Sequence, residues 1–246
     1  LYQEECIFFC DTQEEVDCFP QMDRTFDFPS IISNAIIDID QNSNHNYEYI
    51  IDQLNKVRCG NLEIRIFEQL SKKVYENIFT SLKKSIIEYC VLICPYNSQL
   101  KLKDYEKIIE ENSRIAKIIV HSCGEDSVNE IKKVENSLPI FYTNQIIEDA
   151  SCCGNISRNY FNLDLRFFTE ALKFNTCLNQ KISIDRNGHL KNCPAMKTSY
   201  GQLGERRVEE VVEKKEFQRY WHINKDQIEV CQDCEFRYIC QDCRAI

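Results

Sequence analysis

The sequence predicts an α/β fold, an open or partial α/β barrel followed by a small cysteine-rich domain. Between residues 34 and 143, short apolar segments alternate with amphipathic ones. Strands that alternate with helices at this spacing indicate βαβ units and a mostly parallel sheet. Near residue 150 the alternation stops, and the most closely spaced cysteines lie beyond that point. The sequence therefore divides into an α/β part and a cysteine-rich part.

The predicted barrel part contains five strands and several helices. Apolar runs predict strands at 34–40, 61–67, 86–94, 115–123 and 138–143. Apolar positions about 3.6 residues apart predict helices at 46–57, 71–85, with Ser71 as a possible cap, and 103–113. A further short helix is expected near 126–135. Four or five such units are too few for a closed eight-fold barrel.

A β-hairpin is the strongest local prediction in the C-terminal part. Two alternating runs within 180–193 flank Asn187-Gly188, the preferred pair for a type I′ turn. Helices are expected at 165–174 and 207–221, and a short strand at 6–9. The predicted divisions are an N-terminal strand and connection at 1–33 and a partial barrel at 34–150. A linker with a helix follows at 151–176, and a cysteine-rich domain at 177–246.

The composition excludes several classes of partner. The chain of 246 residues has a net charge of −9, whereas proteins that bind nucleic acid need a basic surface. Anionic membrane surfaces are disfavoured for the same reason. No apolar run approaches the roughly 20 residues of a membrane span, and no signal-peptide pattern is visible. We therefore expect a cytoplasmic protein that binds neither nucleic acid nor membranes.

Fifteen cysteines are many for a chain of this length. The count is odd and no export signal is visible, so the clustered cysteines predict metal binding rather than disulfides. Four of them, Cys231, Cys234, Cys240 and Cys243, form two Cys-x2-Cys pairs. Alone, these four predict a zinc site, although the five residues between the pairs are few for a zinc ribbon.

Two further cysteines lie at the two ends of the predicted hairpin. Cys177 precedes it and Cys193 closes it. A hairpin brings its two ends together, so these residues predict a second pair of ligands. Six thiols exceed one four-ligand site. The set therefore favours two iron–sulfur clusters over one zinc ion.

The order of these cysteines resembles a known domain. Cys177, then Gly188-x4-Cys193, then Cys-x2-Cys-x5-Cys-x2-Cys resembles the SPASM domain, the C-terminal extension of many radical SAM enzymes that modify peptides. The segments 177–203 and 223–245 look like the SPASM peptide maturases of the grasp-with-spasm type, as do 34–50 and 152–161. Such proteins are encoded beside an ATP-grasp ligase and a ribosomal precursor peptide.

The resemblance implies two auxiliary 4Fe–4S clusters. The family pattern ends in Cys-x3-Cys and has one more cysteine, whereas this chain has two residues in the last gap and no further cysteine. We therefore expect the outer cluster to be absent, partial or replaced by another metal, zinc being the alternative, and the tail to be part of a longer domain. The resemblance implies that Cys177, Cys193 and Cys243 bind the inner cluster. It implies that Cys231, Cys234 and Cys240 bind the outer cluster.

The sequence lacks the Cys-x3-Cys-x2-Cys motif that holds the catalytic cluster of radical SAM enzymes. Two Cys-x3-Cys pairs occur, but Gln13 and Asn97 stand where the third cysteine would be. Whether this chain is an enzyme therefore stays open. The cysteines that we interpret as strand or core residues are Cys6, Cys10, Cys59, Cys90, Cys94 and Cys123.

Other candidate residues have ordinary structural interpretations. His121 ends a predicted strand, and we favour a satisfied, partly buried histidine over a ligand. Asp38 and Asp40 end another strand, where capping or solvated roles are preferred over a catalytic pair. The vicinal Cys152 and Cys153 are candidates for a missing metal ligand or a redox pair.

The function expected from the resemblance is that of a component of ribosomal peptide maturation. The chain would bind the precursor peptide and present it to the ATP-grasp ligase. Two other functions stay open. One is a redox or radical enzyme that modifies a peptide through an iron–sulfur cluster with an open iron. The other is a zinc-stapled interaction protein without chemistry.

Overall fold

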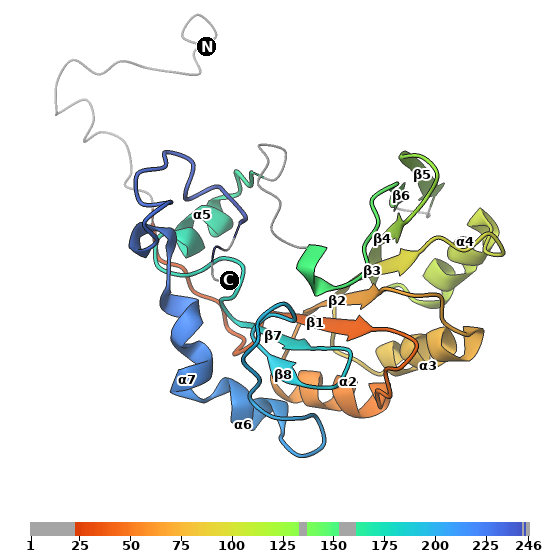
Figure 1. Ribbon diagram of the computed structural model, residues 1–246, viewed down its shortest axis with the longest axis horizontal. Coiled ribbons are helices and arrows are strands. Elements are labelled where there is room, and N and C mark those ends of the chain that lie inside the picture. The colour runs from red at the N-terminus through yellow and green to blue at the C-terminus, as the bar shows by residue number, and fades with distance from the viewer. Residues whose placement is uncertain (1–22, 133–136, 153–160, 243, 245–246) are drawn as a thin grey trace, which may run out of the picture.

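The computed structural model describes residues 23–132, 137–152, 161–242 and 244, which form an open eight-stranded sheet with helices packed on it (Figure 1). The predicted α/β class is confirmed, and the five strands predicted for the barrel are present. The strand predicted at 6–9 lies outside the described residues. The strands are β1 (Asn34–Ile39), β2 (Asn61–Ile66), β3 (Tyr89–Pro95), β4 (Ile115–His121), β5 (Ser127–Lys132), β6 (Ser137–Tyr142), β7 (Lys181–Ile184) and β8 (Leu190–Lys191).

The sheet is mixed, in the order β5-β6-β4-β3-β2-β1-β7-β8. Six central strands run parallel, whereas β5 and β8 are antiparallel to their neighbours at the two edges. Strand β7 pairs with β1, with Asn34 opposite Lys181 and Ile37 opposite Ile184. The hairpin, which the sequence assigned to the cysteine-rich part, therefore extends the same sheet.

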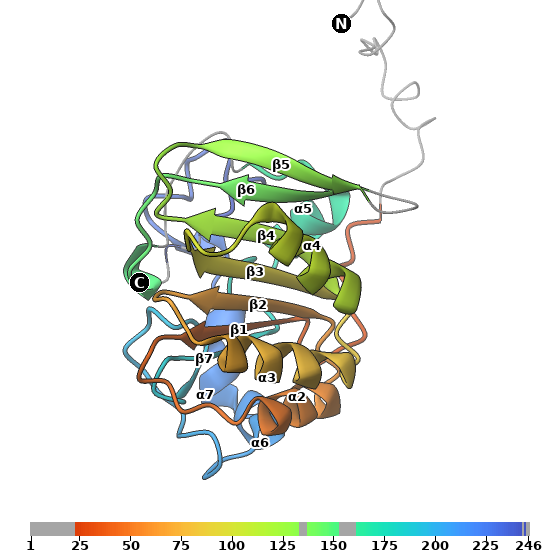
Figure 2. The ribbon, with the colours of Figure 1, turned by 90° about the vertical axis from the view of Figure 1, so that its right-hand side faces the viewer.

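Three amphipathic helices cover one face of the sheet (Figure 2). They are α2 (Tyr47–Lys56), α3 (Lys72–Lys83) and α4 (Leu102–Glu111). The side chain of Asn46 caps α2 by accepting a hydrogen bond from Tyr49 N. Ser71 occupies the equivalent position before α3, but its side chain forms no cap bond. Within the described ranges, no helix combines the length and apolar character needed to cross a membrane.

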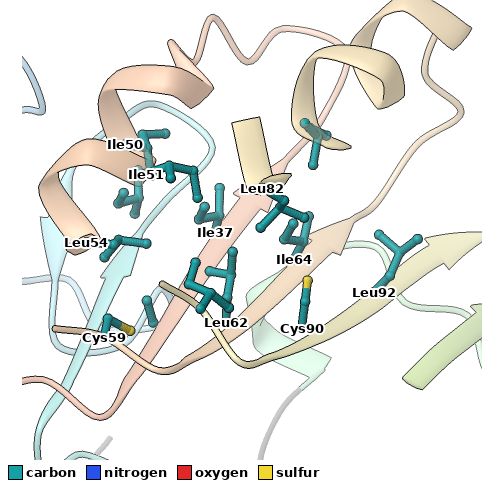
Figure 3. Close-up of a cluster of buried hydrophobic side chains, with 14 of the residues drawn as sticks. Ile37, Ile50, Ile51, Leu54, Cys59, Leu62, Ile64, Leu82, Cys90 and Leu92 are labelled. Atoms are coloured by element: carbon teal, nitrogen blue, oxygen red, sulfur yellow. The ribbon is translucent and has the colours of Figure 1, made fainter. Parts of the chain in front are cut away.

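The main hydrophobic core lies between this face of the sheet and helices α2 and α3 (Figure 3). Side chains of β2 alternate between buried and partly exposed, as expected of a strand with one face on a core. Ile37 of β1 and Leu54 of α2 are buried in this core. Cys59 and Cys90 belong to the same cluster. Their interpretation as small buried apolar residues is therefore confirmed.

Short helices of the C-terminal part complete the structure. Helix α5 follows Asp164, whose carboxylate accepts hydrogen bonds from Arg166 N and Phe167 N. Helices α5 and α7 lie on the side of the sheet away from α3 and α4 (Figure 2). The elements are η1 (Ala150–Cys152), α5 (Leu165–Ala171), α6 (Val208–Val212), α7 (Lys215–Gln218), η3 (Arg219–His222) and η4 (Lys225–Gln227).

The single helix predicted over 207–221 is wrong, because the chain breaks into α6, α7 and η3. Lys214 has an extended backbone, with φ −72° and ψ 132°. Val212 and Phe217 are both fully buried, yet five residues of a continuous helix would turn them about 140° apart. The break at Lys214 allows both side chains to reach the core.

The short helix predicted near 126–135 is also wrong, because residues 127–132 form the edge strand β5. The strand pairs antiparallel with β6 along its whole length, from Ser127 opposite Tyr142 to Lys132 opposite Ser137. Ile131 is buried, whereas Val128 is 56% exposed. Pairing with β6, the next strand along the chain, decides the conformation here and overrides the local helical pattern.

The predicted hairpin is confirmed, but its type I′ turn is not. Asp185 N donates to His189 O at 3.1 Å, and Gly188 N donates to Asp185 O at 2.8 Å. Gly188 has a φ of +84°, whereas Asn187 does not have a positive φ. A type I′ turn needs two such residues, so this is a three-residue loop whose last residue is left-handed. The Asp185 carboxylate favours this loop by accepting a hydrogen bond from Asn187 N.

Candidate functional site

Polar side chains gather at the carboxyl ends of three adjacent parallel strands, β7, β1 and β2. Asp38 of β1 lies opposite Arg65 of β2, and Asp185 follows β7 directly. Open α/β sheets bind ligands outside the carboxyl ends of their strands. This end of the sheet is therefore the candidate functional site.

Asp38 and Arg65 form a buried, bidentate ion pair. Arg65 Nε lies 2.7 Å from Asp38 Oδ1, and Nη2 lies 2.9 Å from Oδ2. The two side chains are 3% and 11% exposed for Asp38 and Arg65. Burial raises the pKa of Asp38, and the Arg65 hydrogen bonds oppose that shift. Burial acts to lower the pKa of Arg65, but Asp38 outweighs it and the pKa is raised. Arg65 therefore stays charged and holds Asp38 in one orientation.

Asp185 organises the hairpin next to this pair. Its carboxylate accepts hydrogen bonds from Asn187 N at 3.0 Å and His189 N at 2.9 Å, and Lys191 Nζ lies 2.9 Å away. Burial acts to raise the pKa of Asp185, but Lys191 and the two backbone donors outweigh it, and the pKa is lowered. Asp185 is therefore an ionised anchor that joins both strands of the hairpin.

Asp40 closes the loop that follows β1. Its Oδ1 accepts a hydrogen bond from Asn42 N at 2.9 Å, and its backbone N donates to Ser43 Oγ at 3.0 Å. Arg186 of the hairpin approaches Asp40 Oδ2 at 3.6 Å. The expected capping role thus fits Asp40. Asp38, by contrast, is neither a cap nor solvated, because it is buried against Arg65.

A pocket of about 290 Å³ lies between these groups and the segment 149–151. One part of its wall is polar and carries charges of both signs, and the other part is apolar. Pro194 and Ala195, which directly follow Cys193, are among the residues that line the pocket. The lining residues are Asp38, Phe67, Asp149, Ala150, Ser151, Asp185, Arg186, Asn187, Lys191, Pro194 and Ala195.

Cys177 and Cys193 lie in the same small hydrophobic region. Cys193 is buried there with Leu178 and Met196, and Cys177 packs against this cluster. Cys193 is 6% exposed, and Cys177 Sγ accepts a hydrogen bond from Lys181 Nζ at 3.7 Å. Both thiols therefore border one cluster next to the hairpin, and the ligand pair expected there stays a prediction.

The C-terminal cysteines are arranged more openly. Cys231 and Cys240 are partly buried, and Cys234 is exposed. Burial raises the pKa of Cys231, the Lys225 ammonium opposes the shift and the Cys240 thiol adds to it. Cys231 and Cys240 are thus close enough to interact electrostatically. Cys243 lies outside the described residues.

The described residues do not bring three ligands of one metal site together. Among them, no group of three or more histidine, cysteine, aspartate or glutamate side chains is placed to hold a metal ion. Cys177 and Cys193 instead share one small hydrophobic cluster, and Cys231 and Cys240 are close enough to interact electrostatically. An all-thiol donor set suits iron–sulfur clusters or zinc, so the chemistry of the residues fits such a group while the geometry is incomplete.

The remaining candidate thiols have structural roles or lie beyond the described ranges. Cys94 is buried, and Cys123 is partly buried with its Sγ 3.2 Å from Val120 O. Cys152 is partly exposed, and its Sγ lies 3.8 Å from Ile146 O. Its neighbour Cys153 and the pair Cys6 and Cys10 lie outside the described residues.

His121 is a buried histidine with both ring nitrogens satisfied. It is 1% exposed, its Nε2 lies 3.0 Å from Ile66 O, and its Nδ1 lies 3.0 Å from Ser122 Oγ. Burial lowers the pKa of His121, and the bond to Ile66 O opposes that shift only in part. The structural interpretation of His121 is therefore supported.

We expect a fall in pH to destabilise the fold through His121, at pH values above those at which the carboxylates titrate. The pKa of His121 in the folded state lies below its ordinary value of 6.5, so the unfolded chain binds the proton more readily. The stabilisation is complete above about pH 6.5 and is lost as the pH falls through the folded-state pKa. The pKa of His45, also lowered by burial, acts in the same direction.

The measurement compares the wild type with His121→Gln, in which the amide can still donate to Ile66 O. The free energy of unfolding, from urea denaturation between about pH 7 and pH 5, should fall less steeply in the variant. An identical pH dependence of the two proteins would show that His121 does not titrate on unfolding.

Comparison of the chain with protein-family models, with curated proteins and with solved structures gives no match. Sequence reasoning identified Asp38 and Asp40 but missed Arg65, Asp185 and Lys191. A usable signal was present in β2, where the alternation places the charged Arg65 on the face opposite the core. Lys191 lies opposite Ser183 and therefore diagonally across from Asp185, a position from which a long side chain can reach the carboxylate.

Proposed function

We propose that this chain is a peptide-binding component of a ribosomal peptide maturation system and works with an ATP-grasp ligase. In this proposal the open sheet with its helices is a partial barrel of the radical SAM type. Residues 177–246 then form a SPASM domain with one or two 4Fe–4S clusters, and zinc is the alternative metal. The observation that carries the proposal is that Cys177 packs against the small cluster in which Cys193 is buried.

The cysteine-rich segment is tied to the rest of the molecule without a metal. Phe161 stacks on Phe236 with ring centroids 5.1 Å apart, and Asn162 N donates to Ile239 O at 2.8 Å. Lys225 is buried and donates a hydrogen bond to the Cys240 carbonyl. The segment is thus held close to the linker before α5. A cluster bound there would add a covalent cross-link and a site for electron transfer.

The proposal assigns binding rather than radical chemistry to this chain. In radical SAM enzymes the catalytic cysteines follow the first barrel strand. Here residues 40–46, which follow β1, read DQNSNHN and contain no cysteine. Asp40 and Ser43 close this loop through hydrogen bonds. A fold does not carry an activity without its site.

The edge strand β5 offers a place for an extended peptide. Strand β5 ends the sheet, and on its far side no strand of the described residues pairs with it. Backbone groups along such an edge are available to another strand. Val128, 56% exposed on β5, would contact the side chains of a peptide added there. The precursor peptide is the occupant that the proposed function requires.

Titration of the purified chain with the precursor peptide encoded beside it tests this proposal. We expect binding that Val128→Asp weakens about fivefold, equal to about 1 kcal/mol, because cross-strand contacts have this magnitude. Ile86→Asp is the matched control, since Ile86 is 50% exposed and precedes β3, which is not a neighbour of β5 in the sheet. Absence of any binding would contradict the function. Equal binding by wild type and both variants would exclude β5 as the site.

A further inference from the structure

Asp149 is a carboxylate of the pocket without a cationic partner. Asp38 is paired with Arg65, and Asp185 with Lys191. Asp149 instead accepts a hydrogen bond from Ser151 N at 2.7 Å, and no ion pair joins it to a cation of the described residues. The Ser151 hydrogen bonds lower the pKa of Asp149. It therefore carries a full negative charge at neutral pH.

Arg186 does not cancel this charge. It contributes to the lowered pKa of Asp149, but its Nη1 lies 3.6 Å from Asp40 Oδ2, and its side chain is 49% exposed. With the histidines neutral, the carboxylates around the pocket exceed the cations by one. Among the residues that line the pocket, the two sets are Asp38, Asp149 and Asp185 against Arg186 and Lys191.

The rest of the pocket wall carries no charge. Phe67, Ala150, Pro194 and Ala195 are apolar, and Ser151 and Asn187 are polar but neutral. A volume of about 290 Å³ is at the lower end for small-molecule sites, and it is large enough for one long side chain. A divalent metal ion does not suit the pocket, because no three carboxylates of the described residues are placed to bind one. The pocket combines one excess negative charge with an aliphatic lining.

We propose that this pocket binds a primary ammonium group carried on an aliphatic stem. The ammonium group lies against Asp149, and the stem lies along Phe67, Ala150 and Pro194. The inference rests on the proposed function for its source, which is the precursor peptide. A lysine side chain and a peptide N-terminus share this chemistry, so the experiment includes both.

Three small probes test the proposal in NMR or calorimetric titrations. They are Nα-acetyl-lysine methylamide, its Nε-acetylated form, and a lysine-free dipeptide amide with a free N-terminus. We expect one of the two amines to bind, and the Nε-acetylated probe to bind at least about tenfold more weakly than the better amine. Binding of the lysine probe alone identifies a side chain as the source, and binding of the dipeptide alone identifies the N-terminus.

Asp149→Asn should weaken binding of the better amine about tenfold, because the variant keeps the hydrogen-bond geometry and loses the charge. Glu148→Gln is the matched control, since Glu148 is the adjacent exposed carboxylate and does not line the pocket. Circular dichroism checks that both variants are folded. Equal affinity for free and acetylated probes, no binding of either amine, or unchanged affinity in Asp149→Asn would overturn the proposal.

The precursor peptide, titrated in parallel, separates this inference from the proposed function. If the precursor binds but the amine probes do not, the pocket assignment fails and the peptide-binding function stands. If an amine probe binds in an Asp149-dependent way but the precursor does not, the pocket assignment stands and its source in the precursor is wrong.

Discussion

Arg65→Met should lower the free energy of unfolding by about 3–5 kcal/mol, the usual cost of removing one partner of a buried ion pair. The Asp38 side chain is 3% exposed and receives two hydrogen bonds from Arg65. Methionine keeps the apolar stem, so the loss of stability reports the unpaired buried carboxylate of Asp38 rather than a cavity. Urea denaturation at neutral pH measures the change in the free energy of unfolding.

Two comparisons separate this effect from a general loss of packing. Because burial already raises the pKa of Asp38, the carboxyl can take up a proton once Arg65 is gone, and the destabilisation should shrink as the pH is lowered. Arg207→Met is the matched control, since Arg207 forms an exposed pair with Glu210 at the same distance of 2.7 Å. Exposed pairs contribute little. A loss in Arg65→Met no larger than in Arg207→Met would contradict the account.

Cys193→Ser should remove the metal of the proposed inner cluster. Cys193 is buried beside Cys177 in the cluster at the open end of the hairpin, and serine cannot replace a thiolate ligand of an iron–sulfur cluster without loss of affinity. Iron and acid-labile sulfide per chain should fall by about four each relative to the wild type.

Two other cysteine variants serve as controls for this loss. Cys234 is exposed and is assigned to the outer cluster, so Cys234→Ser should leave the inner cluster in place. Cys123 lies after β4 with its Sγ near Val120 O, so Cys123→Ser should leave all bound iron. If Cys193→Ser retained the iron of the wild type, the ligand assignment would be wrong.

The alternation of strands and helices was predictable because each element carries its own period. In β2 and α2, one face is apolar at the spacing of a strand or a helix, and the structure buries that face. The hairpin was predictable for the same reason, since its residues are close in sequence. The hairpin also accounts for the placement of Cys177 and Cys193 at one small cluster.

Features that depend on distant residues were not predictable. Strand β5 was missed although its partner β6 is close in sequence, because the residues of β5 do not alternate between polar and apolar. The break at Lys214 follows from where the core accepts Val212 and Phe217. In the same way, the Asp38–Arg65 pair depends on the register of β1 and β2, which a single sequence does not determine.

For the C-terminal cysteines, spacing in the sequence does not predict which thiols share a metal site. Their Cys-x2-Cys pairs predicted ligands, but spacing alone does not say which thiols share a site. The structure places Cys231 and Cys240 within electrostatic reach and leaves Cys234 exposed. The arrangement that binds metal has to bring further ligands to each pair.

Metal and sulfide content after anaerobic purification tests the central claim most directly. We expect at least about four iron and about four acid-labile sulfide per chain, rising to about eight of each if both proposed clusters are present. One zinc per chain with no labile sulfide would contradict the iron–sulfur assignment of Cys177 and Cys193 and support a zinc-stapled protein instead.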